Sequence, residues 1–217
     1  MLFSLILPML SPFVLQTSVQ PASNQAKQFL SSGEISLEVR HLDSYVNEVF
    51  KDNILLTMAY MRNIGENKKN INWKNVNKEF KFKFTLSPNE SFAFHDDVLP
   101  KYKNSLAITT NAHFNYQEGF RSDGYLMGDG VCHLASLIYW VSKQTNLDAY
   151  APTNHSFARI PEIRSEHGVS IYSMPGRAEA NALQNMYVTN NRQNPITFEF
   201  EYNGKSLKLS IYEAQLR

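Results

Sequence analysis

The sequence of 217 residues predicts an α+β fold, in which a central helix that carries the cysteine at its N-terminus packs on a mostly antiparallel sheet. Three observations support this fold class. Residues 78–86 alternate charged and aromatic side chains with period two, which is typical of a strand with one wet face. Helical patterns precede a run of short extended segments, an order that favours α+β. Apolar side chains also recur with helical spacing after a glycine pair, at Leu134, Leu137, Ile138 and Val141.

The remaining elements follow from periodicity and turn residues. Residues 42–61 form an amphipathic pattern that Asp43 or Ser44 can cap, and the Asn-, Lys- and Gly-rich residues 63–77 indicate a loop. Residues 98–119 show no clear period and predict irregular structure with a helical turn. Asn203-Gly204 is a hairpin signal. Further extended segments are predicted at 91–94, 120–127, 152–159, 185–189, 195–202 and 207–211, with a polar loop at 161–175.

The N-terminus carries a targeting pattern. Residues 2–15 are nearly all apolar and residues 16–25 are polar, which predicts a signal peptide or N-terminal anchor over residues 1–24. The apolar run is shorter than the ~20 residues that a membrane span needs. Residues 25–40 are interpreted as a linker and residues 41–217 as one domain. The protein is therefore expected to be exported to the cell envelope, either membrane-associated or secreted, with membrane anchoring through the N-terminal segment as one option.

Composition narrows the classes of partner. Hydrophobic residues make up 43% and charged residues 19%, as in an ordinary globular domain. The net charge of +1 provides no broad field for nucleic acid or an anionic membrane surface, so no nucleic-acid partner is expected. Lysines are frequent between Lys68 and Lys83, but aromatic and acidic residues interrupt them, which indicates a solvated face.

The cysteine is the main candidate for chemistry. Gly128 and Gly130 allow the chain to turn sharply into the helix, which puts Cys132 in its first turn. Unpaired N–H groups and the helix dipole favour a thiolate there, the reactive form of cysteine. The alternative is a small buried hydrophobic residue. In an exported protein a single thiol without a disulfide partner is either intermolecular or chemically useful.

A cysteine nucleophile needs a base, and six histidines are available. His133 neighbours the cysteine, but adjacent helical residues point ~100° apart. His155, on a strand predicted to return towards the same end of the sheet, is the better candidate. A Gly-x-Cys helix start followed by a strand histidine is the arrangement of papain-like and transglutaminase-like thiol enzymes. Spacing does not choose the third, orienting group, for which the candidates are Asn154, Asp129, Glu162 and Glu179.

Two further groups have roles in this hypothesis. The N–H groups of Cys132 and His133 are candidates for an oxyanion hole. Arg177, after Pro175-Gly176, is a candidate for binding a substrate carboxylate. The cysteine, histidines and Asp129 match no zinc-ligand spacing, so neither a metal nor another cofactor is expected.

The sequence resembles the VanW family in four places. Leu86-Ser87-Pro88-Asn89-Glu90-Ser91-Phe92-Ala93-Phe94 is similar to its Pro-Gly-Glu-x-Phe-Ser-Phe segment, and the stretch from Gly128 to Tyr139 to its Gly-Gly-Gly-Val-Cys-Gln-Val-Ser-Thr-x-Leu-Tyr. Asn154-His155-Ser156-Phe157 resembles its His-Ser-Tyr stretch, and Tyr187-Val188-Thr189-Asn190-Asn191 with Pro195-Ile196 its Phe-x-Asn-Asn…Pro-Ile strand pair. The resemblance covers roughly residues 40 to 215. Asp129 replaces a usual glycine, His133 replaces the usual Gln, and Glu179 is a candidate substitute for an Asp that usually follows Pro-Gly-Arg.

The resemblance implies a bacterial cell-envelope protein of a family associated with glycopeptide-antibiotic resistance, and some members look like peptidoglycan L,D-transpeptidases. It implies that Cys132 attacks a peptidoglycan stem peptide, releases a terminal D-alanine and passes the acyl group to an amine. The expected catalytic residues are Cys132, His155 and Glu179, and the expected substrate-binding residues are Gly130, His133, Ser156 and Arg177. The alternatives are a non-catalytic binding or accessory protein of the envelope and a thiol peptidase of wall peptides.

Overall fold

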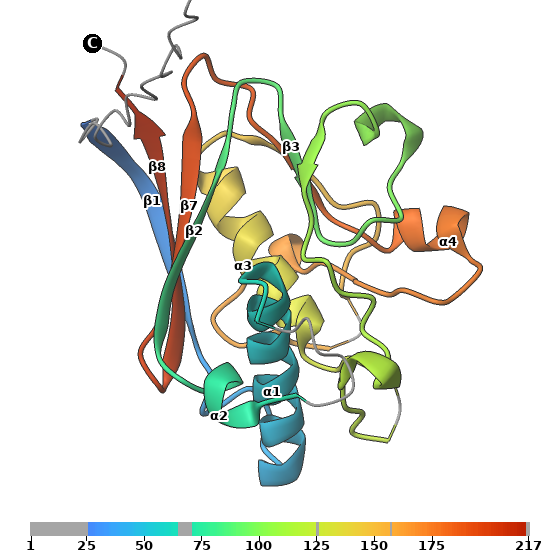
Figure 1. The fold of residues 1–217 in the computed structure, drawn as a ribbon. Coiled ribbons are helices and arrows are strands. Elements are labelled where there is room, and N and C mark those ends of the chain that lie inside the picture. The colour runs from blue at the N-terminus through green and yellow to red at the C-terminus, as the bar shows by residue number, and fades with distance from the viewer. Residues whose placement is uncertain (1–25, 65–70, 125, 157, 216–217) are drawn as a thin grey trace, which may run out of the picture.

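The computed structural model describes residues 26–64, 71–124, 126–156 and 158–215 (Figure 1). The predicted signal peptide or anchor, residues 1–24, lies outside the described residues. The helices are α1 (Ser44–Met61), α2 (Trp73–Val76), α3 (Val131–Gln144) and α4 (Ala178–Leu183). The strands are β1 (Lys27–Ser36), β2 (Phe80–Leu86), β3 (Ser91–Ala93), β4 (Leu106–Ile108), β5 (Asp148–Tyr150), β6 (Tyr187–Thr189), β7 (Ile196–Tyr202) and β8 (Ser206–Ala214).

The described strands form two four-stranded sheets. The first has the order β1-β8-β7-β2 and is antiparallel throughout. The second has the order β4-β3-β6-β5, in which only the β3–β4 pair is parallel. The predicted α+β class and the mostly antiparallel pairing are therefore confirmed, with two sheets where one was expected.

Helix α3 lies at the centre of the fold and contacts β1, β8, β5 and α1 (Figure 1). Its predicted apolar stripe is fully buried, at Leu134, Leu137, Ile138 and Val141. The helix approaches β1 so closely that a Cβ on Gly33 would lie 2.7 Å from both Trp140 Cζ3 and Val141 Cγ2. A residue without a side chain in β1 is therefore required where α3 crosses the sheet.

Several predicted elements are confirmed. Asp43 caps α1, since its carboxylate accepts the Val46 N–H at 3.0 Å. In β2 the lysines are exposed and Phe84 and Leu86 are buried, as the period of two predicts. The hairpin between β7 and β8 turns at Asn203-Gly204, where Gly204 has a φ of 90°.

Four segments differ from prediction. Residues 27–36, expected within a linker, form β1 along the edge of the first sheet, where Ile35 is completely buried. The described residues of the predicted strand at 152–159 do not form one, because their backbone bonds to residues 168–170, with an isolated bridge between Asn154 and Val169. In place of the predicted strand at 120–127, the described residues show an isolated bridge between Ser122 and Met127. The predicted loop at 63–77 contains α2.

None of the helices in the described ranges combines the length and apolar character needed to cross a bilayer.

Candidate functional site

The glycine turn before α3 is built as the sequence predicts. Gly128 has a φ of 83° and Gly130, at the N-cap of α3, a φ of 94°, both in the left-handed region that favours glycine. A Cβ on Gly130 would also lie 2.7 Å from Phe50 Cα and 2.8 Å from the Phe50 carbonyl oxygen. Conformation and the close approach of α1 thus both require glycine at 130. Cys132 follows in the first turn of α3, as expected.

Asp129 holds this turn. Its carboxylate accepts the Asp123 N–H at 2.9 Å, and the Asn53 amide donates to the Asp129 carbonyl at 2.8 Å. Burial raises the pKa of Asp129 to about 6, against the opposing effect of the Asp123 N–H. Of the uses considered for Asp129, the structure therefore places it in the turn.

A cavity of about 380 Å³ opens over the start of α3 and brings the main candidates together. Cys132, His133 and His155 all contribute to its wall. The cysteine and the histidine chosen from sequence thus face one space, although the chain between them forms the whole of α3 and β5. The other lining residues of the cavity are Arg40, His41, Phe50, Asp123, Leu126, Met127, Gly128, Asp129, Gly130, Ala158, Arg159, Ile171 and Tyr172.

The Cys132 sulfur is held by the backbone of Ile171. Sγ accepts the Ile171 N–H at 3.3 Å and donates to the Ile171 carbonyl at 3.7 Å. Cys132 keeps some exposure to solvent, yet burial is the largest influence on its thiol and raises the pKa to about 11. The Ile171 N–H acts in the opposite direction, and the charge of Asp129 adds to the increase. The expectation of a thiolate is therefore wrong, because in this geometry the thiol is protonated at neutral pH.

His155 is oriented by a backbone carbonyl. Its Nδ1 lies 3.1 Å from the Ala158 oxygen, and because a carbonyl only accepts, the hydrogen is on Nδ1 and the lone pair on Nε2. Burial lowers the pKa of His155, although the Ala158 contact acts to raise it. The cavity wall therefore carries a neutral thiol and a neutral imidazole whose Nε2 has the form of a base.

The structure does not bring the expected third group to this cavity. Glu179 is exposed on α4 and is not among the lining residues, because the 171–177 segment carries α4 away from the start of α3. The position beside His155 Nδ1 is occupied by the Ala158 carbonyl instead. Asn154 donates to the carbonyls of Ser165 and Gly168, and Glu162 pairs with Arg40.

The expected substrate-binding residues divide into two groups. Gly130 and His133 line the cavity, whereas Arg177 is exposed at the N-cap of α4 and does not. Ser156 is exposed and lines a neighbouring cavity of about 330 Å³ that shares His155 and Ala158. The His133 N–H donates to the Gly130 carbonyl at 2.9 Å. Of the two N–H groups expected to form an oxyanion hole, the Cys132 N–H therefore remains as the candidate.

Arg40 is a cavity residue that sequence reasoning missed. It lies between β1 and α1, is 3% exposed, and donates from Nη2 to the Glu162 carboxylate. The Asn47 side chain fixes its backbone by accepting the Arg40 N–H at 2.6 Å. Its Nε and Nη1 have no hydrogen-bond partner in the part of the chain that the structure describes. A single arginine before a predicted helix gives no signal of this environment.

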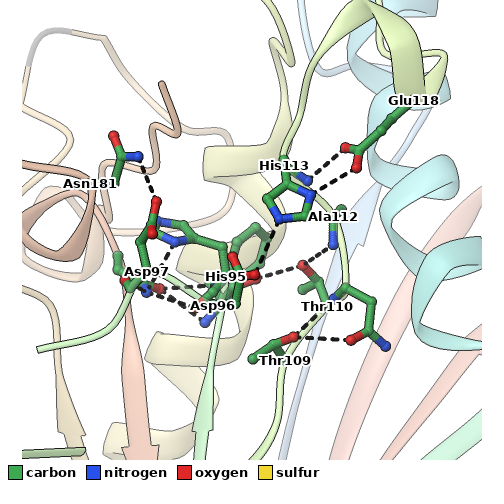
Figure 2. A network of polar contacts seen from close by, with 12 residues as sticks. His95, Asp96, Asp97, Thr109, Thr110, Ala112, His113, Glu118 and Asn181 are labelled. Carbon is green, nitrogen blue, oxygen red and sulfur yellow. Dashed lines mark hydrogen bonds and ion pairs between the residues drawn. The ribbon is translucent and has the colours of Figure 1, made fainter. Parts of the chain in front are cut away.

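Figure 2 shows a second polar network, several of whose residues line a different cavity from that of Cys132. His113 contacts Glu118 Oε1 through Nδ1 at 2.8 Å and Asp96 Oδ2 through Nε2 at 3.2 Å. Partial burial acts to lower the His113 pKa, but the two carboxylates outweigh it and raise the pKa. Asp97 accepts from Asn181 at 2.6 Å, so the network ties the 95–97 turn both to the 113–118 loop and to α4.

Across the described residues, no group of three or more His, Cys, Asp or Glu side chains is arranged to hold a metal ion.

The model of the family described as "VanW like protein" matches residues 68–212, which include Cys132 and His155. The chain belongs to the VanW family. Membership indicates a protein associated with the cell envelope. Neither the curated proteins nor the solved structures gave a match. β1 and Arg40 lie outside the range that the VanW model matches.

Proposed function

We propose that this VanW-family protein is an exported, cysteine-dependent acyl transferase that acts on peptidoglycan stem peptides in the manner of an L,D-transpeptidase. One observation carries the proposal: Cys132 at the glycine-turned start of α3 and His155 with its Nε2 lone pair line the same cavity. Nucleophile, base and an orienting group for the base are the parts that thiol acyl transfer requires.

The protonation states favour transfer of the proton during attack rather than before it. As Sγ bonds to the peptide carbonyl carbon, His155 Nε2 takes the thiol proton, and the Ile171 N–H at 3.3 Å stabilises the charge that develops on sulfur. His155 then gives this proton to the leaving nitrogen as the C–N bond breaks. The product is a thioester on Cys132 and a released amino acid.

The second half of the reaction returns the thiol. An amine from a neighbouring stem peptide attacks the thioester, a C–N bond forms as the C–S bond breaks, and its proton passes through His155 to the sulfur. Water in place of the amine gives hydrolysis, the activity of a thiol peptidase.

Defined stem peptides and mass spectrometry test the proposal. Crosslinked dimers and a thioester adduct on Cys132 are the expected products, and Cys132→Ala should abolish both. His155→Ala should reduce the rate by about 10²- to 10⁴-fold, the usual contribution of a positioned base. His167→Ala is the matched control, because His167 does not line the cavity. Shortened monomers without dimers would indicate the peptidase.

A non-catalytic envelope binding protein is the second candidate. The thiol pKa of about 11 and the contacts of Sγ with Ile171 favour it, because a protonated, hydrogen-bonded sulfur is also the state of a structural cysteine. Peptide binding with neither product nor thioester adduct, unchanged in Cys132→Ala, would support this candidate over the transferase.

A further inference from the structure

We infer that Arg40 and His133 form an anion subsite in the cysteine cavity, which binds the free carboxylate of the residue that leaves from the stem peptide. The inference rests on the proposed function and narrows it: the scissile bond is one residue from a free carboxyl terminus. Arg40 would then be a specificity-determining residue supplied by a segment outside the range that the family model matches.

The first argument is the unpartnered guanidinium. The Arg40 side chain has no solvent exposure, and only Nη2 has an acceptor, the Glu162 carboxylate. Nε and Nη1 are buried without a partner among the described residues. A buried donor left without a hydrogen bond is destabilising, and more so when it is charged. Because Arg40 lines the cavity, an acceptor oxygen of a ligand can satisfy these donors.

The second argument is His133, which reaches the same cavity from α3. It is 4% exposed, and its Nδ1 also has no hydrogen-bond partner in the described ranges. Phe50 and His155 pack edge-on against its ring at centroid distances of 5.2 and 6.3 Å and fix its orientation. Arg40 lies close enough to lower the His133 pKa, and its effect is second in size only to that of burial. The unpartnered atoms of Arg40 and His133 therefore belong to one environment.

The charges around the cavity select the ligand. Arg159 adds a positive charge at the wall, whereas Asp123 and Asp129 face the cavity from the glycine turn and oppose a multiply charged anion. A volume of about 380 Å³ accepts the end of a peptide rather than a polymer. A carboxylate of single charge at a peptide terminus fits both constraints better than a phosphate group.

Binding without chemistry tests the subsite independently of catalysis. In the full chain carrying Cys132→Ala, calorimetry compares a stem tetrapeptide that ends in D-alanine with the same peptide ending in D-alanine carboxamide. The acid should bind at least about tenfold more tightly, because hydrogen bonds between charged groups are stronger than those to a neutral amide. Equal affinities, or binding of neither peptide, would overturn the inference.

Variants identify the residue responsible. Arg40→Gln in the Cys132→Ala background should remove the preference for the acid. Glu162→Gln breaks the ion pair between Arg40 and Glu162 but keeps the guanidinium, so this variant should retain the preference for the acid. Arg164→Gln changes an exposed arginine and should also retain the preference. If Arg40→Gln does not fold in a thermal melt, Arg40→Lys replaces it and should weaken the preference. A preference that survives the loss of the guanidinium would contradict the assignment.

The two proposals fail separately. Acid-selective binding without a thioester adduct in the Cys132 protein would leave the subsite in place and refute the transferase. Equal transfer from acid and carboxamide donors would support the transferase and refute the subsite.

Discussion

Cys132 experiences two opposing influences on its charge. A helix N-terminus typically stabilises a negative charge by about 0.3–1 kcal/mol. Burial acts against it, and the rise of the pKa from 9.0 to about 11 corresponds to a cost on the order of 3 kcal/mol. Burial therefore outweighs the helix terminus. Burial also lowers the pKa of His155, so both side chains would be uncharged at the start of the proposed reaction.

The pH dependence of alkylation tests this balance. Thiolate is the reactive form, so the iodoacetamide labelling rate of Cys132 should be lower than that of free cysteine at pH 7. Because the folded pKa is raised, the rate should still be increasing above pH 9, with its midpoint near 11. The urea-unfolded chain is the control and should show the midpoint of an ordinary thiol. A folded-state midpoint at or below 7 would instead indicate a preformed thiolate–imidazolium pair.

The site residues show what sequence reveals at this scale. The positions of Gly130 and Cys132 at the start of α3 are predictable, because a glycine turn and a helical period are local patterns. His155 lines the same cavity as Cys132, but not from the strand on which it was predicted. The contact of Sγ with Ile171 and the burial of Arg40 beside the cavity both join Cys132 to segments far from it along the chain. No local pattern encodes either. The thiol pKa is raised rather than lowered because of burial, which the local pattern around Cys132 also does not show.

The junction between α1 and α3 depends on one residue without a side chain. Gly130 turns the chain into α3 and at the same time allows α1 to approach at Phe50. The periods of the two helices predict both elements, but not that they meet there. The prediction of a strand at 152–159 is wrong for a related reason, namely that the local pattern does not show which segment the residues pair with. Their hydrogen bonds are made to residues 168–170.

Gly130→Ala should lower the free energy of unfolding by at least about 3 kcal/mol. A left-handed φ costs a non-glycine residue about 1–2 kcal/mol, and the new Cβ at 2.7 Å from Phe50 Cα adds a backbone clash. Gly176→Ala is the matched control, because its φ is 75° with no atom within 4 Å of the built Cβ. Urea denaturation measures both, and the control should lose only the conformational cost. Equal losses would show that packing against α1 does not matter.

At the scale of the whole molecule, the family range does not coincide with the folded unit. The VanW model matches residues 68–212, yet β1 pairs with β8 along most of its length and α1 packs on α3. Periodicity and element order predicted the fold class but not β1. The first six residues of this strand are exposed or only half-buried, and the alternation of buried and exposed positions is confined to Gly33, Glu34 and Ile35. So short an alternation is not a strand signal, and the pairing with β8 is what makes the segment a strand.

The full-length chain offers a matched pair of variants that measures how much β1 contributes to stability. Ile35 is completely buried, and truncating such a side chain to alanine typically costs about 2–5 kcal/mol, a large part of the 5–15 kcal/mol that stabilises most domains. Ile35→Ala should therefore lower the midpoint of thermal unfolding clearly. Gln28→Ala, at an exposed position of the same strand, should leave it nearly unchanged. Equal midpoints for the two variants would show that β1 contacts the domain without contributing to its stability.

Removing the N-terminal part of this unit should unfold the domain, although the deleted residues lie outside the family range. A chain of residues 41–217 lacks all of β1, together with the completely buried Leu37, and it leaves the edge of β8 unpaired. An exposed strand edge also favours association between copies. Circular dichroism should show no cooperative thermal transition for residues 41–217, and light scattering should show aggregates. A cooperative transition of the truncated chain at the full-length midpoint would restore the interpretation of residues 25–40 as a linker, because the domain would then be complete without them.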